Sequence, residues 1–179
     1  MSREMTLARK MVAIHDHLRD AGIAHAFGGA LALAWCTQQA RGTIDLDVNI
    51  FLGPEHTDAT LAALPRGVVA TDDDIRLLVR DGQARLHWGT TPVDVFLNTT
   101  PFHESVAGRV RWEPFAGTEL PFLACDDLAV FKAFFSRTKD WADLEAMHDA
   151  GTLDVAAVAG VLTTFLGPSD DRIARLLSL

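Results

Sequence analysis

The sequence has no long apolar run and very little cysteine, and both features narrow the class of protein. No apolar stretch approaches the roughly 20 residues that a membrane-spanning helix needs. The charged N-terminal residues contain no apolar core of a secretory leader. The two cysteines, Cys36 and Cys125, lie in apolar surroundings, so we expect reduced side chains that pack as small hydrophobes. These features predict a soluble, cytoplasmic protein with no membrane partner.

Several short functional motifs are also missing. The sequence contains no G-x-x-x-x-G-K-[S/T], no G-x-G-x-x-G, no H-E-x-x-H and no C-x-x-C. His15 and His17 form an H-x-H pair, but side chains two residues apart on a helix point in different directions. These absences disfavour a P-loop enzyme, a dinucleotide-binding protein and a zinc hydrolase.

What is present indicates a globular chain with a real core. The 179 residues are 49% hydrophobic and 22% charged, and the net charge of -8 disfavours a large nucleic-acid footprint. Strand-like and helix-like segments alternate up to residue 125, and from Asp126 the pattern is helical throughout. We therefore predict an α/β (α+β) fold, with a mixed twisted sheet and flanking helices in residues 1–125. A C-terminal helical segment, 126–179, should pack on this core.

The individual elements follow from apolar periodicity and from glycine and proline positions. Helices are predicted at 3–21, 30–39, 54–65, 71–82, 101–109, 126–137, 139–151, 152–167 and 168–179. Strands are predicted at 23–27, 43–52, 83–89, 92–98, 110–115 and 120–125.

Acidic residues stand inside two of these apolar strands. In "TIDLDVNIFL" (43–52), Asp45 and Asp47 are two residues apart and should face the same side, with Ile44, Leu46 and Val48 on the other. Two such carboxylates repel each other unless a proton or a cation lies between them. Mg²⁺ prefers oxygen ligands of this kind.

A third acidic residue, Asp94, lies in the apolar run "PVDVFL". If the two strands are neighbours, Asp45, Asp47 and Asp94 meet on one face and can hold two Mg²⁺ ions about 4 Å apart, as in phosphoryl and nucleotidyl transfer. The alternative for Asp94 is an edge-strand acid that faces water. The pair Asp72 and Asp74 also has this spacing, but "TDDDIR" is typical of a solvated helix start.

Glycines and basic residues supply candidate phosphate ligands. Gly28 and Gly29 lie between a strand and a helix, where backbone N–H groups can approach a phosphate, although many such pairs are only tight turns. Arg41 and Thr43 precede the acidic strand, and Arg41 can reach a phosphate, brace a carboxylate or remain solvated. Further along, "KAFFSRTKDW" contains Lys132, Arg137, Lys139 and Asp140. Lys132 lies on an apolar face, where it can also extend to solvent, and Asp140 can simply stabilise a first helical turn.

Taken in order, these motifs resemble the nucleotidyltransferase-fold superfamily. The residues that carry the resemblance are "GGALALAWCTQQARGTIDLDVNI", then "VDVF", then "KAFFSRTKD". The last stretch matches the K-x4-R-x-K-D motif of the AbiEii/MenT-like toxin nucleotidyltransferases, the most similar branch. The resemblance covers residues 23–145 and leaves the last helices unmatched.

The resemblance implies an Mg²⁺-dependent nucleotidyltransferase that moves an NMP from an NTP to an acceptor hydroxyl. Asp45, Asp47 and Asp94 would be catalytic and would hold two Mg²⁺ ions. The expected nucleotide-binding residues are Gly28, Gly29, Arg41, Thr43, Lys132, Lys139 and Asp140. The acceptor can be tRNA, a protein or a small molecule, and a toxin-like member would have an antitoxin partner. The alternatives are an antibiotic-modifying adenylyltransferase and a non-catalytic nucleotide-binding member of the fold.

Overall fold

A computed structural model describes residues 5–179, which divide into two compact units. Unit 1 contains the described residues up to Gly28 together with Gly42–Phe122, and unit 2 contains Gly29–Arg41 together with Leu123–Leu179. The sequence suggested one boundary near residue 125. The structure in addition groups the segment 29–41 with the helices that follow that boundary.

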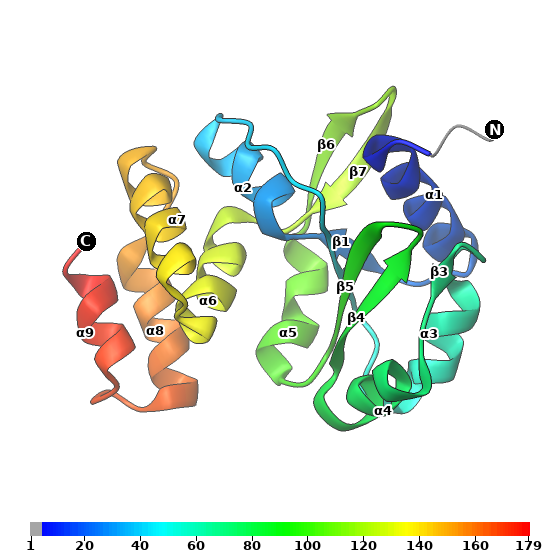
Figure 1. Ribbon diagram of the computed structural model, residues 1–179. Coiled ribbons are helices and arrows are strands. Elements are labelled where there is room, and N and C mark those ends of the chain that lie inside the picture. The colour runs from blue at the N-terminus through cyan, green and yellow to red at the C-terminus, as the bar shows by residue number, and fades with distance from the viewer. Residues whose placement is uncertain (1–4) are drawn as a thin grey trace. The chain divides into compact units, whose positions relative to one another are not determined.

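Unit 1 is built on one mixed β-sheet, as the predicted α/β class requires (Figure 1). Among the described residues the sheet has seven strands in the order β3-β4-β5-β2-β1-β7-β6. The strands are β1 (His25–Phe27), β2 (Leu46–Ile50), β3 (Val68–Val69), β4 (Gln83–Trp88), β5 (Thr91–Leu97), β6 (Arg111–Phe115) and β7 (Thr118–Phe122). β2 pairs with β5 in parallel, as β1 does with β7, and the remaining pairs are antiparallel. β2 and β5, the two strands that carry the predicted acids, are therefore neighbours.

The helices of unit 1 have clear start and stop signals in the sequence. They are α1 (Leu7–Asp20), α3 (Thr57–Ala63), α4 (Asp72–Asp81) and α5 (Pro101–Val106), with 3₁₀ turns η1 (Pro54–His56) and η2 (Ala107–Arg109). Thr71 and Asp74 form a capping box at the start of α4, and Gly82 ends that helix with a φ of 69°. α4 packs beside β4, at the β3 edge of the sheet (Figure 1).

One face of the central strands forms the core of unit 1. Leu46, Val48 and Ile50 of β2 are fully buried, as are Val93 and Val95 of β5. Leu86 of β4 and the α1 residues Met11, Ile14 and Leu18 are fully buried too. Because residues alternate along a strand, this apolar face leaves the acids on the opposite face of β2 and β5.

Unit 2 is entirely helical among the described residues. Its helices are α2 (Gly29–Thr37), α6 (Cys125–Phe135), α7 (Thr138–Asp149), α8 (Val155–Leu166) and α9 (Asp171–Leu177). α6 packs against α2, α7 and α8, and α8 packs against α9. The buried side chains include Trp141 and Leu144 of α7 and Leu162 of α8. The predicted C-terminal helices are therefore confirmed: α6 and α7 begin one residue earlier and end two residues earlier than predicted, and α8 and α9 are shorter at both ends.

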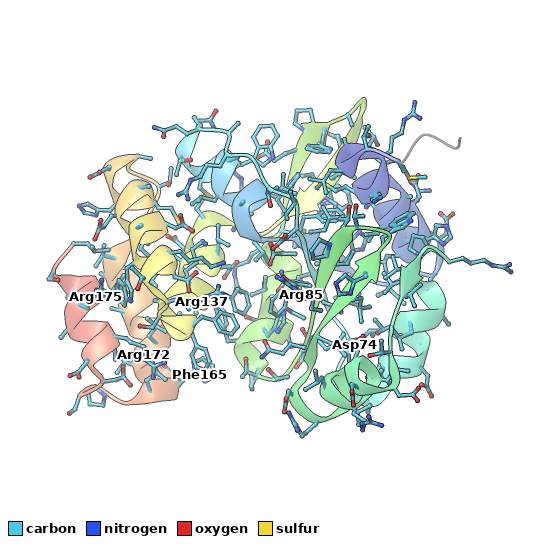
Figure 2. All side chains as sticks on the ribbon, in the orientation of Figure 1. Asp74, Arg85, Arg137, Phe165, Arg172 and Arg175 are labelled. Atoms are coloured by element: carbon cyan, nitrogen blue, oxygen red, sulfur yellow. A yellow bond between two sulfur atoms is a disulfide. The ribbon has the colours of Figure 1, made fainter. Side chains whose placement is uncertain are left out.

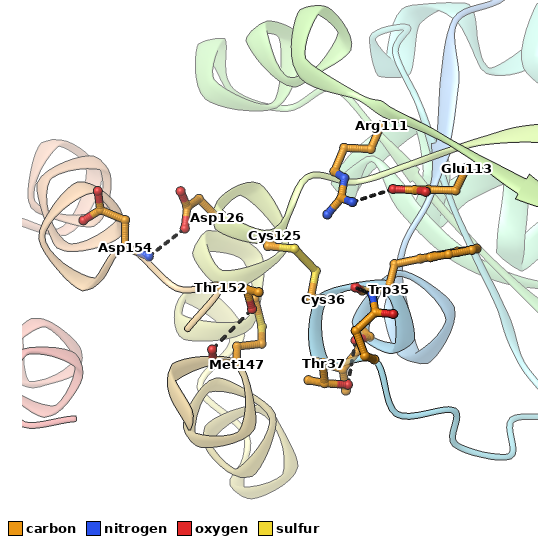
Figure 3. Close-up of a disulfide and its surroundings, with 12 residues drawn as sticks. Trp35, Cys36, Thr37, Arg111, Glu113, Cys125, Asp126, Met147, Thr152 and Asp154 are labelled. Atoms are coloured by element: carbon orange, nitrogen blue, oxygen red, sulfur yellow. Dashed lines mark hydrogen bonds and ion pairs between the residues drawn. A yellow bond between two sulfur atoms is a disulfide. The ribbon is translucent and has the colours of Figure 1, made fainter. Parts of the chain in front are cut away.

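The two cysteines form a disulfide, and our expectation of reduced thiols is wrong. Cys36 near the end of α2 and Cys125 at the start of α6 are bonded, with their Cα atoms 5.7 Å apart (Figure 3). Both side chains are buried, as their apolar neighbours suggested. The expectation failed because apolar surroundings are common to packed thiols and to buried disulfides, and the sequence does not show which helices face each other.

Two details of the predicted elements also need correction. The acidic strand begins at Leu46 and not at residue 43, and Ile44 is 76% exposed instead of buried on the apolar face. The short edge strand β3 was not predicted, because two residues are too few to show a periodicity. Between residues 5 and 179, no helix is both long enough and apolar enough to cross a bilayer.

Candidate active site

Three polar side chains form a row across the centre of the unit 1 sheet. Asp47 of β2 lies directly opposite Asp94 of β5, and Asp94 lies directly opposite Arg85 of β4. Residues paired in this way project from the same face of a sheet. Asp47 and Asp94 therefore lie side by side on one face of the sheet, as predicted. Arg85, which the sequence analysis did not identify, lies next to Asp94 on the same face.

Asp45 reaches this row from the loop just before β2. The Thr43 hydroxyl accepts a hydrogen bond from the Asp45 N–H at 3.2 Å and lies 3.2 Å from the Asp45 carbonyl oxygen. This small turn fixes the backbone of Asp45. Thr43 thus has a structural role here, and its role in nucleotide binding stays a prediction.

Arg85, whose side chain is labelled in Figure 2, contacts two of the three acids. Its Nε and Nη2 donate to the two carboxylate oxygens of Asp94 at 2.8 and 2.7 Å, and Nη2 also donates to Asp45 Oδ2 at 3.2 Å. The side chains of Asp45 and Asp94 are 33% and 18% exposed, and that of Arg85 is 54% exposed. Because Arg85 Nη2 contacts both Asp45 Oδ2 and Asp94 Oδ2, the distance between these two oxygens cannot exceed the sum of the two contact distances.

The charges of all three acids act on Arg85. The pKa of Arg85 is raised above its ordinary value, first by its hydrogen bonds to Asp94 and by the charge of Asp94, and then by the charges of Asp45 and Asp47. The single positive charge of Arg85 thus interacts with all three carboxylates. A divalent cation would offset the mutual repulsion of these carboxylates.

The donor set fits magnesium. Carboxylate oxygens are the ligands that Mg²⁺ prefers, and the site already holds one cationic group between Asp45 and Asp94. Between residues 5 and 179, no group of three or more His, Cys, Asp and Glu side chains converges closely enough to form a ready-made metal site. The assignment of Asp45, Asp47 and Asp94 as metal ligands stays a prediction.

The glycine turn begins beside the same strand. The Gly28 N–H donates to the carbonyl oxygen of Asp47 at 2.9 Å, directly after β1 ends at Phe27. Gly29 has a φ of 56°, a conformation that favours glycine, and it opens α2. The predicted strand–glycine–helix order is confirmed. The contact of these glycines with phosphate stays a prediction.

Three of the remaining predicted residues, Arg41, Lys132 and Asp140, belong to a second charged cluster, within unit 2. Lys132 of α6 is only 8% exposed, and its Nζ donates to Asp143 Oδ2 of α7 at 2.6 Å. Arg41 pairs with the other oxygen of the same Asp143. Asp140 Oδ1 lies 3.8 Å from Lys132 Nζ.

Asp140 has a further cationic neighbour in Arg137, whose Nε donates to its Oδ2 at 2.7 Å. Burial alone would raise the pKa of Asp140, but the hydrogen bonds from Arg137 hold it below its ordinary value. Lys139 is exposed on the surface of α7. The structure thus brings together Arg41, Lys132 and Asp140, and adds Asp143, which the sequence analysis missed.

Comparisons with known proteins bear on the fold. No protein-family profile matches the sequence, and no curated protein matches it. The solution structure of the antibiotic-resistance factor ANT(2'')-Ia matches with a TM-score of 0.54 and 12% identity, over 94% of this chain and 88% of that one. A nucleotidyltransferase-like protein from Paracoccidioides brasiliensis matches with a TM-score of 0.47 and 14% identity, over 79% of this chain and 74% of that one.

The chain has the fold of the nucleotidyltransferases, as the resemblance implied. At 12% identity the likeness to ANT(2'')-Ia concerns the fold. Activity, substrates and the AbiEii/MenT-like branch are therefore matters for the proposal that follows.

Proposed function

We propose that this protein is an Mg²⁺-dependent nucleotidyltransferase that transfers an NMP from an NTP to an acceptor hydroxyl. The observation that carries the proposal is the register of the sheet, which sets Asp47 opposite Asp94 on neighbouring parallel strands. Asp45 contacts the same arginine as Asp94, so the three acids share one electrostatic site. A fold shared with a known nucleotidyltransferase supports the same reaction class.

In this proposal Asp45, Asp47 and Asp94 hold two Mg²⁺ ions. When bound, such ions stabilise the charge on the phosphates and lower the pKa of the attacking hydroxyl. The acceptor oxygen forms a bond to the α-phosphorus, the bond from that phosphorus to the bridging oxygen breaks, and pyrophosphate leaves. Asp94 takes the hydroxyl proton as the general base.

The phosphates would be bound by backbone and basic groups. Gly28 is supported by its position beside Asp47, and Gly29 by a backbone conformation that suits a close approach to a ligand. In unit 2, three cations lie around two carboxylates. Lys132 and Arg41 would supply positive charge for the phosphates, with Thr43, Lys139 and Asp140 as further predicted nucleotide-binding residues.

The acceptor is proposed as a small molecule, a tRNA or a protein. The fold match to an antibiotic-resistance factor supports a small-molecule acceptor. The K-x4-R-x-K-D motif instead supports a toxin-like transfer to tRNA or protein, with a cognate antitoxin. The net charge of -8 disfavours an extended RNA surface.

The test is incubation of the pure protein with each α-labelled NTP, Mg²⁺ and, in turn, a cell extract or a panel of antibiotics that carry hydroxyl groups. Label should pass to one acceptor class, with release of pyrophosphate. Asp47→Asn should reduce transfer at least about 100-fold because a charged ligand is lost. Asp73→Asn, an exposed acid in the first turn of α4, should leave transfer unchanged.

A non-catalytic member of the fold would give a different result. It would bind an NTP with Mg²⁺, yet release no pyrophosphate with any acceptor. Full activity of the Asp47→Asn variant would show that the reaction does not use these acids.

A further inference from the structure

Arg85 occupies the oxygens that the metal ions would need. Three of the four carboxylate oxygens of Asp45 and Asp94 accept hydrogen bonds from its guanidinium. An arginine guanidinium is always charged in proteins. A divalent cation that binds the same oxygens would lie within a few ångströms of this positive charge, and the two would repel each other.

Arg85 can leave this position without disturbing the core. Its two neighbours on β4, Ala84 and Leu86, are buried and hold the strand, while the Arg85 side chain is half exposed. Rotation about its side-chain bonds is therefore enough to release both acids. A guanidinium that leaves carboxylates needs another anion of suitable geometry, and a phosphate accepts the same pair of parallel hydrogen bonds.

We infer that Arg85 couples metal binding to nucleotide binding. Without ligands, its guanidinium neutralises part of the charge of Asp45 and Asp94 and weakens the binding of a divalent cation. When an NTP is present, Arg85 transfers its hydrogen bonds to the phosphates and the acids become free for the ions. Arg85 is thus a positioning residue, and this inference rests on the proposed nucleotidyltransferase function.

The coupling predicts opposite changes in two affinities for the Arg85→Ala variant. Mn²⁺ alone, titrated by calorimetry or by the loss of its free electron paramagnetic resonance signal, should bind about tenfold more tightly than to the unmodified protein. Unreactive methylene-bridged analogues of the four NTPs, measured at saturating Mn²⁺, should bind about tenfold more weakly. Bound metal increases the affinity for nucleotide by the same factor by which bound nucleotide increases the affinity for metal. This factor should be smaller in Arg85→Ala than in the unmodified protein.

Two variants control for charge and for geometry. Arg80→Ala on α4 removes the same charge from an arginine that pairs with the exposed Asp81, and both affinities should change less than about twofold. Arg85→Lys retains the charge but not the paired hydrogen bonds, so its two affinities should lie between those of the unmodified protein and those of Arg85→Ala. Arg85→Gln keeps most of the side-chain stem and repeats the test if Arg85→Ala fails to fold.

The outcomes separate this inference from the proposed function. If Asp47→Asn abolishes Mn²⁺ binding while Arg85→Ala leaves it unchanged or weaker, the acids bind metal and the coupling role of Arg85 is wrong. If Asp47→Asn and Asp94→Asn bind Mn²⁺ as the unmodified protein does, the metal site itself is wrong and the proposed function fails with it.

Discussion

The two charged clusters of this chain differ in burial and in balance. In unit 1, three carboxylates face one arginine, and the paired side chains remain accessible to water. In unit 2, Asp140 and Asp143 are buried and are surrounded by Arg41, Lys132 and Arg137. A buried charge must be paired, whereas a half-exposed one can remain partly uncompensated. The comparison indicates that the buried pairs of unit 2 contribute more to the stability of the fold, while the unit 1 acids remain accessible to a ligand.

The largest expected effect comes from breaking the buried cluster. Asp143→Asn leaves the buried Lys132 with Asp140 at 3.8 Å as its main counter-charge, and should lower the free energy of unfolding by about 3 to 5 kcal/mol. Asp45→Asn, the matched change in unit 1, breaks a solvent-exposed contact with Arg85 and should lower the free energy of unfolding by less than about 1 kcal/mol. Urea denaturation of both variants measures the difference. Equal losses would mean that the two clusters do not differ in their structural role.

A somewhat smaller effect should follow from reducing the disulfide of unit 2. Cys36 and Cys125 are 89 residues apart in sequence, so the bond restricts a long loop of the unfolded chain. Reduction should lower the free energy of unfolding by about 3 kcal/mol. Guanidinium denaturation with and without a phosphine reductant measures this loss. The Cys36→Ser, Cys125→Ser double variant should not respond to the reductant, and alkylation of both cysteines in the unreduced, denatured protein would contradict the bond.

The unit 1 acids could be placed from the sequence more fully than the unit 2 cluster. Alternating apolar residues located β2 and β5, and that alternation puts Asp47 and Asp94 on the polar face. The predicted strands 83–89 and 92–98 did not give the register, which depends on a two-residue turn at Gly89 and Thr90 that sets Arg85 opposite Asp94. Arg85 was missed because its polar position in a half-buried strand is ordinary when the strand is considered alone.

The unit 2 cluster depends on contacts that no local pattern reveals. Asp143 lies one helical turn after Asp140, which places both on one face of α7. Its two cationic partners come from α6 and from residue 41, far away in the chain. The same holds for the disulfide, whose cysteines belong to different helices. Helix-to-helix packing decides these contacts, and it is not encoded in the period of a single helix.

Low pH should destabilise unit 1 more than unit 2, and we expect this effect to be smaller than the two effects above. In unit 1, His25 donates from Nδ1 to the Ile23 carbonyl at 2.9 Å, and its Nε2 then accepts from His15 Nδ1 at 3.0 Å. Both rings are neutral in this chain of hydrogen bonds. Burial lowers the pKa of His15, and burial lowers the pKa of His25 to about 4.

The direction of the pH effect on stability follows from the different pKa values of His25 in the folded and unfolded chain. Between its ordinary value of 6.5 and about 4, the unfolded chain binds a proton that the folded chain does not, so stability is lost as the pH falls through this window. His25 alone should cost about 2 kcal/mol at pH 5 relative to pH 7.5. The pKa of Asp140 in unit 2 is lowered, so its contribution is present above 3.8 and is lost only below that pH. At pH 5, unit 1 should therefore be weakened while the Asp140 pairs are retained.

Hydrogen exchange measured by mass spectrometry at pH 5 and pH 7.5, corrected for intrinsic rates, tests this order. Peptides from α1 and β1 should lose protection at pH 5, and peptides from α7 should keep theirs. In His25→Gln, which carries no titrating ring at this position, the pH-dependent loss in α1 and β1 should shrink by about 2 kcal/mol, and the buried His15 and His103, whose pKa values are also lowered, contribute to what remains. A uniform loss of protection across both units would show that acid acts on the whole chain, and that the difference in burial between the clusters does not translate into separate stabilities.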